Sequence, residues 1–219
     1  MPALKLPATL ARNPDLGDAE RKYLLYALGK AADLGVTVKL SRARMVRCGG
    51  FLSSGYFTDV PEPVLAVATG KPTDEWFSTF IHEACHMEQW AEGSDAWTSL
   101  TVDGVDACSL IDGWLSGDAV DDGVIADAVK RVKAMEADCE RRVLRKVKAF
   151  ALPIAPALYS QRANAYIHFY DWMLENRKWY PASSPPYGTD GIVVAAPSRI
   201  ADSAPRTLRK AYYAHYGTA

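Results

Sequence analysis

Residues 73–93 read TDEWFSTFIHEACHMEQWAEG, and the fold prediction starts from this segment. Asp74 and Glu75 stand near its beginning, where acidic side chains favour the positive end of a helix dipole, and Gly93 is expected to end it. Its apolar residues recur at helical spacing; they are Trp76, Phe77, Phe80, Ile81, Ala84 and Cys85. The pattern predicts one long amphipathic helix.

Within this helix, two histidines and a glutamate follow an HExxH pattern. His82 and His86 are four residues apart, so they lie about 40° apart around a helix and both imidazoles project to one side. They can then bind one zinc ion at about 2.0–2.1 Å. Glu83 lies about 60° beyond His86, where it can take a proton from a zinc-bound water and pass it to the leaving amine. The alternative is a pair of solvated helix histidines.

A catalytic zinc needs a third protein ligand, and the metzincin spacing is a poor source for it here. That spacing expects a glycine at position 89 and a histidine or aspartate at position 92. The chain has Gln89 and Glu92, and the glycine comes only at Gly93. Glu92 is therefore not the preferred ligand.

The segment MEADCE at 135–140 is a better source of the third ligand. On the helical wheel of residues 122–150, Glu136 falls in the middle of the apolar stripe and Glu140 falls at its edge. A carboxylate in a core stripe is costly unless a positive partner balances it, and a metal would be such a partner. We assign Glu136 as ligand and Glu140 as its supporting acid, with the reverse order left open. The alternative for either residue is a salt bridge in the core.

Three segments carry a resemblance to a known family. They are HEACHMEQW at 82–90, MEADCERR at 135–142 and ANAYIHFYDWMLENRKW at 163–179. Together they resemble metallopeptidase domains encoded in phage and prophage genomes, over about half of the chain. The resemblance implies a gluzincin-like zinc site with His82, His86 and Glu136 as ligands and Glu83 as base. It implies no particular substrate.

Several other side chains are weaker candidates for a role in the site. Tyr166 is the candidate for stabilising an oxyanion, and the alternative is a core tyrosine with a satisfied hydroxyl. His168 lies on the polar face of its predicted helix and is expected to be solvated. Cys85 and Cys139 each adjoin a predicted ligand and are expected to be packing residues. The alternative for these thiols is a fourth ligand that silences the zinc.

The remaining elements follow from periodicity and from glycine and proline positions. Helices are predicted at 18–34, 122–150 and 157–179, with a short one near 206–216, and 94–117 is expected to be an ordered connection. Strands are predicted at 36–40, 44–47, 51–57 and 64–68, with a turn at Gly49-Gly50. Val64–Ala68 is expected to be the edge strand that holds a substrate backbone by strand addition.

The sequence therefore predicts an α+β, zincin-like fold in a single domain spanning residues 1–219. An N-terminal lobe of about 15–93 would contain the small sheet and the active-site helix. A helical C-terminal lobe of about 118–180 would supply Glu136. Residues 181–219, rich in proline, serine, glycine and alanine, are expected to form an irregular tail.

Composition limits the possible partners. The 219 residues are 49% apolar and 23% charged, which is ordinary for a globular protein. The net charge of −1 gives no general attraction to nucleic acid or to an anionic membrane. The basic run at 141–148 is expected to be a solvated helix face, so nucleic-acid binding is not favoured. No segment suits a membrane span or a secretory signal, so we expect a cytoplasmic protein, in the host cytoplasm if phage-encoded.

Two functions are compatible with these residues. The preferred one is zinc-dependent hydrolysis of peptide bonds in a polypeptide substrate, with Glu83 as general base. The second is a zinc-binding interaction protein that cleaves nothing. The same three ligands serve both functions, so the sequence does not separate them.

Overall fold

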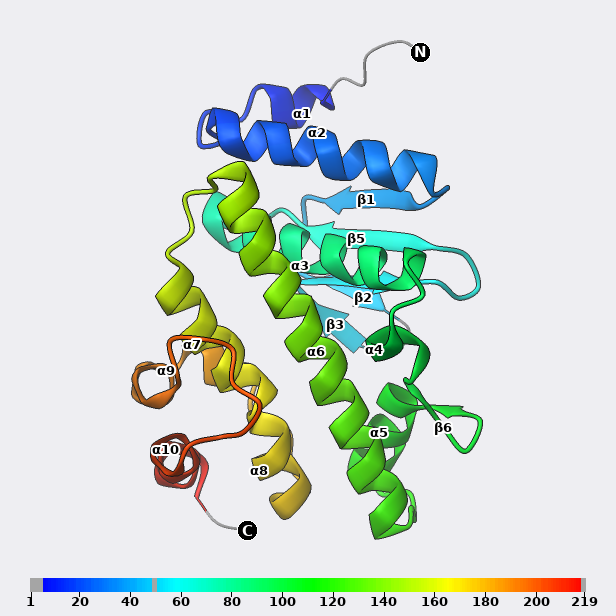
Figure 1. The fold of residues 1–219 in the computed structure, drawn as a ribbon, viewed down its shortest axis with the longest axis vertical. Coiled ribbons are helices and arrows are strands. Elements are labelled where there is room, and N and C mark those ends of the chain that lie inside the picture. The colour runs from blue at the N-terminus through cyan, green and yellow to red at the C-terminus, as the bar shows by residue number, and fades with distance from the viewer. Residues whose placement is uncertain (1–5, 49–50, 218–219) are drawn as a thin grey trace. The chain divides into compact units, whose positions relative to one another are not determined.

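The computed structural model describes residues 6–48 and 51–217, which form an α+β fold (Figure 1). It divides into two compact units. The first contains residues up to Ser94 together with Arg142–Pro153, and the second contains Asp95–Arg141 and the chain from Ile154 onward. The boundary falls inside one continuous helix, α6 (Asp122–Phe150). The last turns of this helix therefore belong to the first unit, although the sequence assigns the whole helix to the C-terminal lobe.

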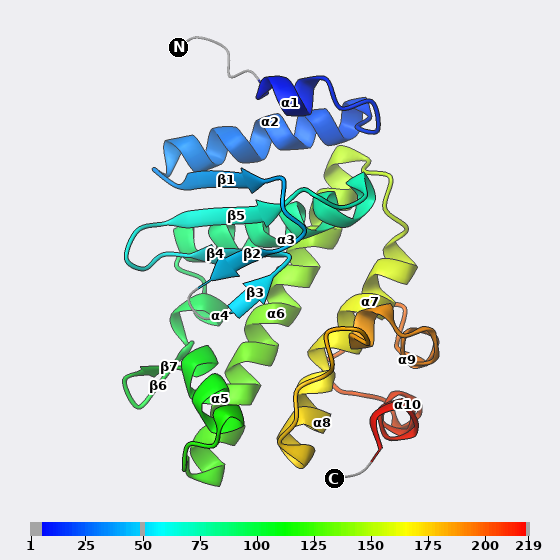
Figure 2. The ribbon, with the colours of Figure 1, turned by 180° about the vertical axis from the view of Figure 1, so that it is seen from behind.

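The sheet of the first unit has three strands in the order β1 (Thr37–Ser41), β5 (Val64–Ala68) and β4 (Gly55–Thr58). Strand β5 runs parallel to β1 and antiparallel to β4 (Figure 2). The prediction that Val64–Ala68 is the edge strand is wrong, because β5 is the central strand. Leu65 to Ala68 are all buried, and a strand that is apolar on both faces is typical of the middle of a covered sheet.

The segment predicted as one strand at 51–57 forms two strands. Phe51–Ser53 is β3, and it pairs antiparallel with β2 (Val46–Cys48) in a separate two-stranded sheet. A bend at Ser54 separates β3 from β4. The chain can thus join two different sheets within a few residues, which a period-two pattern does not reveal. The turn predicted at Gly49-Gly50 lies outside the described residues.

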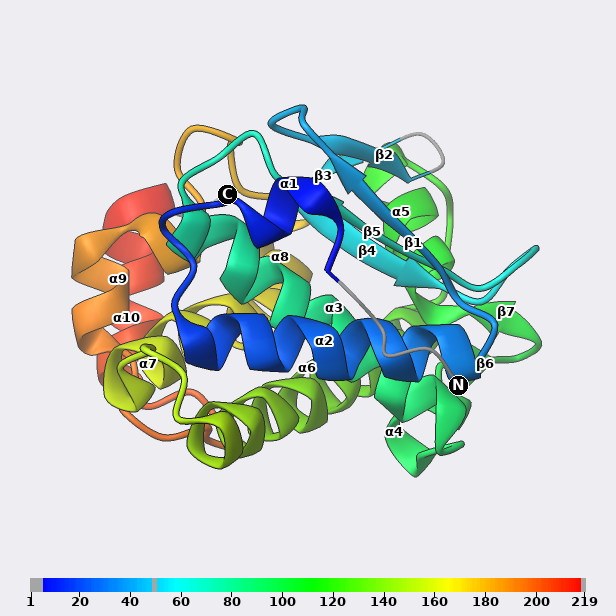
Figure 3. The same ribbon diagram turned by 90° about the horizontal axis from the view of Figure 1, so that it is seen from above.

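Two helices of the first unit pack side by side along the sheet, α2 (Asp18–Asp33) and α3 (Thr73–Ala91) (Figure 3). Both begin where the sequence predicts. The ring of Tyr23 on α2 packs edge-on against Phe77 and Phe80 on α3, with centroids 6.0 and 6.4 Å away. The predicted apolar stripe of α3 is buried, so this helix has a fixed orientation about its own axis. A short helix, α1 (Ala8–Ala11), precedes α2.

The second unit is mainly helical, around a core contributed by several helices. The predicted connection at 94–117 is ordered and contains α4 (Asp95–Thr98), β6 (Thr101–Val102), β7 (Val105–Asp106) and α5 (Ala107–Ser116). The helix predicted at 157–179 is interrupted at His168 into α7 (Pro156–Ile167) and α8 (Phe169–Asn176). None of the described helices combines the length and apolarity that crossing a bilayer requires.

The segment at 181–219 is not the irregular tail that the sequence predicts. It contains a 3-10 turn at Pro186–Gly188, α9 (Asp190–Ala195) and α10 (Arg206–Tyr216), and only the last helix was anticipated. Asn164 on α7 anchors it, because the buried amide donates to the carbonyls of Pro197 and Arg199 at 2.8 and 2.7 Å. The same amide accepts the N–H of Ala201 at 3.0 Å.

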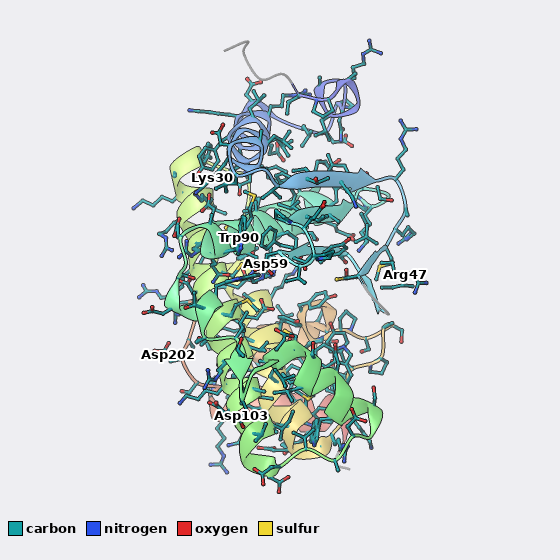
Figure 4. All side chains as sticks on the ribbon, turned by 90° about the vertical axis from the view of Figure 1, so that its right-hand side faces the viewer. Lys30, Arg47, Asp59, Trp90, Asp103 and Asp202 are labelled. Atoms are coloured by element: carbon teal, nitrogen blue, oxygen red, sulfur yellow. The ribbon has the colours of Figure 1, made fainter. Side chains whose placement is uncertain are left out.

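A buried carboxylate joins the helices of the first unit. Oε1 of Glu88 on α3 lies 2.8 Å from Nζ of Lys146 on α6 and 3.4 Å from Nζ of Lys30 on α2. Lys30 is labelled in Figure 4. The hydroxyl of Tyr26 donates to the Glu88 carboxylate at 2.9 Å. Burial by itself raises the pKa of Glu88, but hydrogen bonds and charges from Lys146, Tyr26 and Lys30 outweigh it and hold the pKa below its ordinary value. This network fixes the last turns of α3 against two other helices.

Glu88→Gln is expected to reduce the free energy of unfolding by about 2–3 kcal/mol, since it leaves Lys146 without its charged partner. Because the folded pKa of Glu88 is lowered, its contribution is present above the unfolded pKa of about 4.3 and is lost as the pH falls through the folded value. Urea unfolding at several pH values measures the difference, which should shrink below about pH 4. Glu92→Gln, an exposed acid one turn later, is the control and should cost less than about 1 kcal/mol. Equal losses for both variants would contradict the assignment.

Candidate metal centre

Helix α3 brings the two motif histidines together, as the sequence predicts. The Nε2 atoms of His82 and His86 are 3.0 Å apart. Two nitrogens bound tetrahedrally to one zinc at about 2.0–2.1 Å would be about 3.3 Å apart, so little movement separates this pair from a shared ion. His86 is buried and His82 is half-buried. The pair therefore converges on one point at the surface of α3.

Gln89 contacts the other side of the His86 ring. Its Oε1 atom is 2.8 Å from Nδ1 of His86, and the Gln89 side chain is fully buried at 0% exposure. The contact is not predicted from the sequence, where Gln89 stands out only as the position at which a metzincin has glycine. The spacing between His86 and Gln89 could have indicated it, because residues three apart are neighbours on a helix.

Glu83 lies at the contact between α3 and strand β4. Its side chain is 8% exposed. A Cβ atom added to Gly55 of β4 would lie 3.1 Å from Cγ of Glu83 and 2.7 Å from Cγ2 of Thr79. It would also lie 3.0 Å from the carbonyl oxygen of Ala66. Only glycine allows the strand and the helix to approach this closely, so Gly55 sets the position of β4 beside Glu83.

The hairpin β2–β3 is also electrostatically linked to Glu83. Burial, and then the negative charge of Glu83, raise the pKa of the Cys48 thiol on β2. Arg47, the residue before it, is exposed on the hairpin and is labelled in Figure 4. The negative charge of Glu83 thus helps to keep this thiol protonated.

Helix α6 contains the predicted acids and an adjacent cysteine. Glu136 and Glu140 are both buried, as expected for carboxylates on the apolar stripe, and Cys139 between them is also buried. Glu140 accepts a hydrogen bond from the hydroxyl of Tyr159 at 2.5 Å. A hydroxyl partner therefore satisfies part of the hydrogen-bonding capacity of the acid predicted to play the supporting role.

One group of three residues, among those that the structure describes, is arranged so that it could hold a metal ion. It consists of His82, His86 and Cys139, whose ligand atoms all lie within 4.8 Å of one another. From the sequence, Cys139 is expected to be a packing residue, with metal binding as the alternative. The group contains this thiol and does not contain Glu136.

Tyr166, the candidate for oxyanion stabilisation, forms a pair with Tyr170. Their hydroxyl oxygens are 3.0 Å apart. Burial raises the pKa of Tyr166 well above its ordinary value, and the charges of Tyr170 and Glu136 raise it further. Burial, and then the charge of Glu136, also raise the pKa of Tyr170 well above its ordinary value. Both hydroxyls therefore stay protonated and keep the ability to donate a hydrogen bond.

The prediction that His168 is solvated is wrong. His168 is only 1% exposed, and its Nδ1 atom lies 3.8 Å from a carboxylate oxygen of Asp171. Lys133 of α6 bonds the same carboxylate. The segment after residue 181 covers the face that the sequence predicts to be solvated. Asn164 on this face donates to the carbonyls of Pro197 and Arg199, and His168 lines a small pocket together with Tyr212 and Tyr213 of α10.

Neither a protein-family model, nor a curated protein, nor a solved structure matches this chain. The resemblance to phage-encoded metallopeptidase domains therefore rests on its three sequence segments and stays a prediction. The geometry of the side chains is the basis for the functional argument.

Gly55→Ala is expected to reduce the free energy of unfolding by about 1–3 kcal/mol, because the new methyl group meets Thr79, Glu83 and the backbone of β5. Urea unfolding measures the loss. Gly191→Ala in α9 is the matched control, since an added Cβ there has no atom within 4 Å. That change should be neutral or stabilising by up to about 1 kcal/mol, the usual preference of a helix for alanine. If the Gly55→Ala protein is as stable as the control, strand β4 does not pack on helix α3 as closely as described.

Proposed function

We propose that this chain is a zincin-like, zinc-dependent hydrolase of peptide bonds. The observation that carries the proposal is the 3.0 Å approach of the His82 and His86 Nε2 atoms on α3, with Glu83 one residue along the same helix. Two imidazoles with a thiolate or a carboxylate form a donor set that suits zinc well. The polypeptide substrate and the cytoplasmic location remain predictions from the sequence.

The third ligand would come from α6, and two side chains compete for the role. Glu136 completes the set that the sequence predicts, whereas Cys139 belongs to the group whose ligand atoms lie within 4.8 Å. The two residues are three apart, so they lie on neighbouring parts of one helix face. We prefer Glu136, because two histidines and a glutamate are the ligand set found in catalytic zinc sites of peptidases, with water in the fourth position.

The protein side chains would have the following roles in hydrolysis. A bound zinc would polarise the substrate carbonyl and lower the pKa of a water molecule. Glu83 would accept a proton from the attacking water and donate it to the nitrogen of the leaving amine, so the proton is conserved. In this proposal Tyr166 would donate a hydrogen bond to the oxyanion, and Tyr170, whose hydroxyl lies 3.0 Å from that of Tyr166, would orient it.

Strand β4 supports a polypeptide as the substrate. It lies at one end of the three-stranded sheet, where a strand can pair with an extended chain through its backbone groups. The contact at Gly55 brings this strand beside Glu83. A peptide added to β4 would therefore run close to the proposed general base. We therefore propose that β4, rather than Val64–Ala68, binds the substrate backbone.

Cys139 favours a second candidate function, a zinc-binding protein without hydrolytic activity. If Cys139 and Glu136 bound the metal together with both histidines, four protein ligands would occupy a tetrahedral ion. Closed sites of this kind are structural, because no position remains for water. The two functions predict different coordination spheres and are separable by experiment.

Glu83→Gln is expected to retain zinc and to lose at least about 100-fold of the peptide cleavage rate, because the amide cannot accept the proton. Elemental analysis measures the zinc, and a peptide library with and without chelator measures cleavage. Glu92→Gln on the same helix is the control and should leave cleavage unchanged. Cleavage by Glu83→Gln at the unmodified rate would contradict the mechanism. Zinc binding without any cleavage by the unmodified protein would favour the non-catalytic function.

Substitutions on α6 identify the third ligand. If Glu136 is the ligand, Glu136→Gln should weaken zinc binding by more than about 100-fold, whereas Cys139→Ser should have a small effect. Cobalt substitution tests the thiol directly, since a cobalt–thiolate bond gives a charge-transfer band in the near ultraviolet. Cys85→Ser, a buried cysteine of α3, is the control. A band that disappears in Cys139→Ser but not in Cys85→Ser would assign Cys139 as a ligand.

A further inference from the structure

We propose that Gln89 is a positioning residue that holds the His86 ring in the orientation and tautomer that bind the metal. The inference rests on the metal-binding part of the proposed function and is independent of whether peptide bonds are cleaved. The observation behind it is the 2.8 Å contact between Oε1 of Gln89 and Nδ1 of His86, with both side chains buried.

The chemistry of the two groups determines the direction of this hydrogen bond. An amide oxygen is only an acceptor, so His86 must donate through Nδ1–H. A neutral imidazole carries one proton, and Nε2 is then left with its lone pair. That atom is the one that lies 3.0 Å from Nε2 of His82. The opposite tautomer would direct an N–H group at the shared point and could not bind a metal there.

The turn of α3 that contains Gln89 is itself held rigidly. The neighbouring residue, Glu88, is bonded by Lys146, Lys30 and Tyr26 from two other helices. The backbone carbonyl of Gln89 accepts the N–H of Ser94 at 3.0 Å, which closes the end of the helix. The amide oxygen therefore has a nearly fixed position relative to His86, and positioning of this kind requires a rigid support.

A neutral amide would orient the histidine without adding charge to the site. Metal-binding histidines often donate their second N–H to a carboxylate, which also raises the basicity of the ring. Gln89 would orient the ring in the same way but would not raise its basicity, because the amide carries no charge. A carboxylate at the same position should therefore preserve the orientation, whereas an apolar side chain of similar size should abolish it.

The experiment compares Gln89→Leu, which removes the acceptor, with Gln89→Glu, which keeps one. Zinc affinity is measured by competition with a chromophoric chelator, and thermal unfolding without zinc reports the stability of each variant. Gln89→Leu should bind zinc about 10–100-fold more weakly, as removal of a group that supports a ligand usually does. Gln89→Glu should bind within a few-fold of the unmodified protein. Met87→Leu, a buried change on the same helix, is the control and should leave the affinity unchanged.

Nitrogen NMR of the zinc-free protein measures the tautomer of His86. This tautomer should not change if Gln89 only stabilises the fold. The unmodified protein should have the His86 tautomer protonated at Nδ1, and Gln89→Leu should shift the population toward the Nε2–H tautomer. Unchanged zinc affinity and an unchanged tautomer in folded Gln89→Leu would overturn the proposal. Failure of the unmodified protein to bind zinc would instead overturn the metal site, and the tautomer measurement would still test the role of Gln89.

Discussion

The close packing of strand β4 on helix α3 is the constraint on which the site in the first unit depends. At Gly55 the strand meets Thr79 and Glu83 with no room for a side chain. Glu83 is buried, and this contact brings the end strand of the sheet beside it. A buried carboxylate next to a strand that can pair with an extended chain is an arrangement suited to peptide chemistry.

Helix α3 both supports the fold and carries two of the three residues that could hold a metal ion. The apolar stripe packs into the core, and Glu88 bonds to groups of α2 and α6. On a different side of the same turns, His82, His86 and Gln89 form a chain of polar contacts. The packing of the apolar stripe and the bonds of Glu88 hold the helix in place. They thereby also orient the imidazoles, because all of these side chains share one rigid backbone.

Much of the fold could be predicted wherever a local pattern is enough. The predicted bounds of β5 and α6 agree with the structure, and α2 and α3 begin at the predicted residues. The order of strands could not be predicted in the same way, because pairing joins residues that are far apart in the chain. That is why β5 was assigned to the edge. The order in the segment after residue 181 also depends on tertiary contacts, such as those of Asn164 with Pro197 and Arg199.

By itself, the sequence determined that His82, Glu83 and His86 share one helix and that both imidazoles project together. Helical periodicity is a local property, so five residues are enough to establish it. Only the tertiary structure decided that Gly55 lies beside Glu83 and that Cys139 offers a ligand atom within 4.8 Å of those of the two histidines. Those neighbours come from other elements, and their positions result from packing between segments that no single stretch of sequence describes.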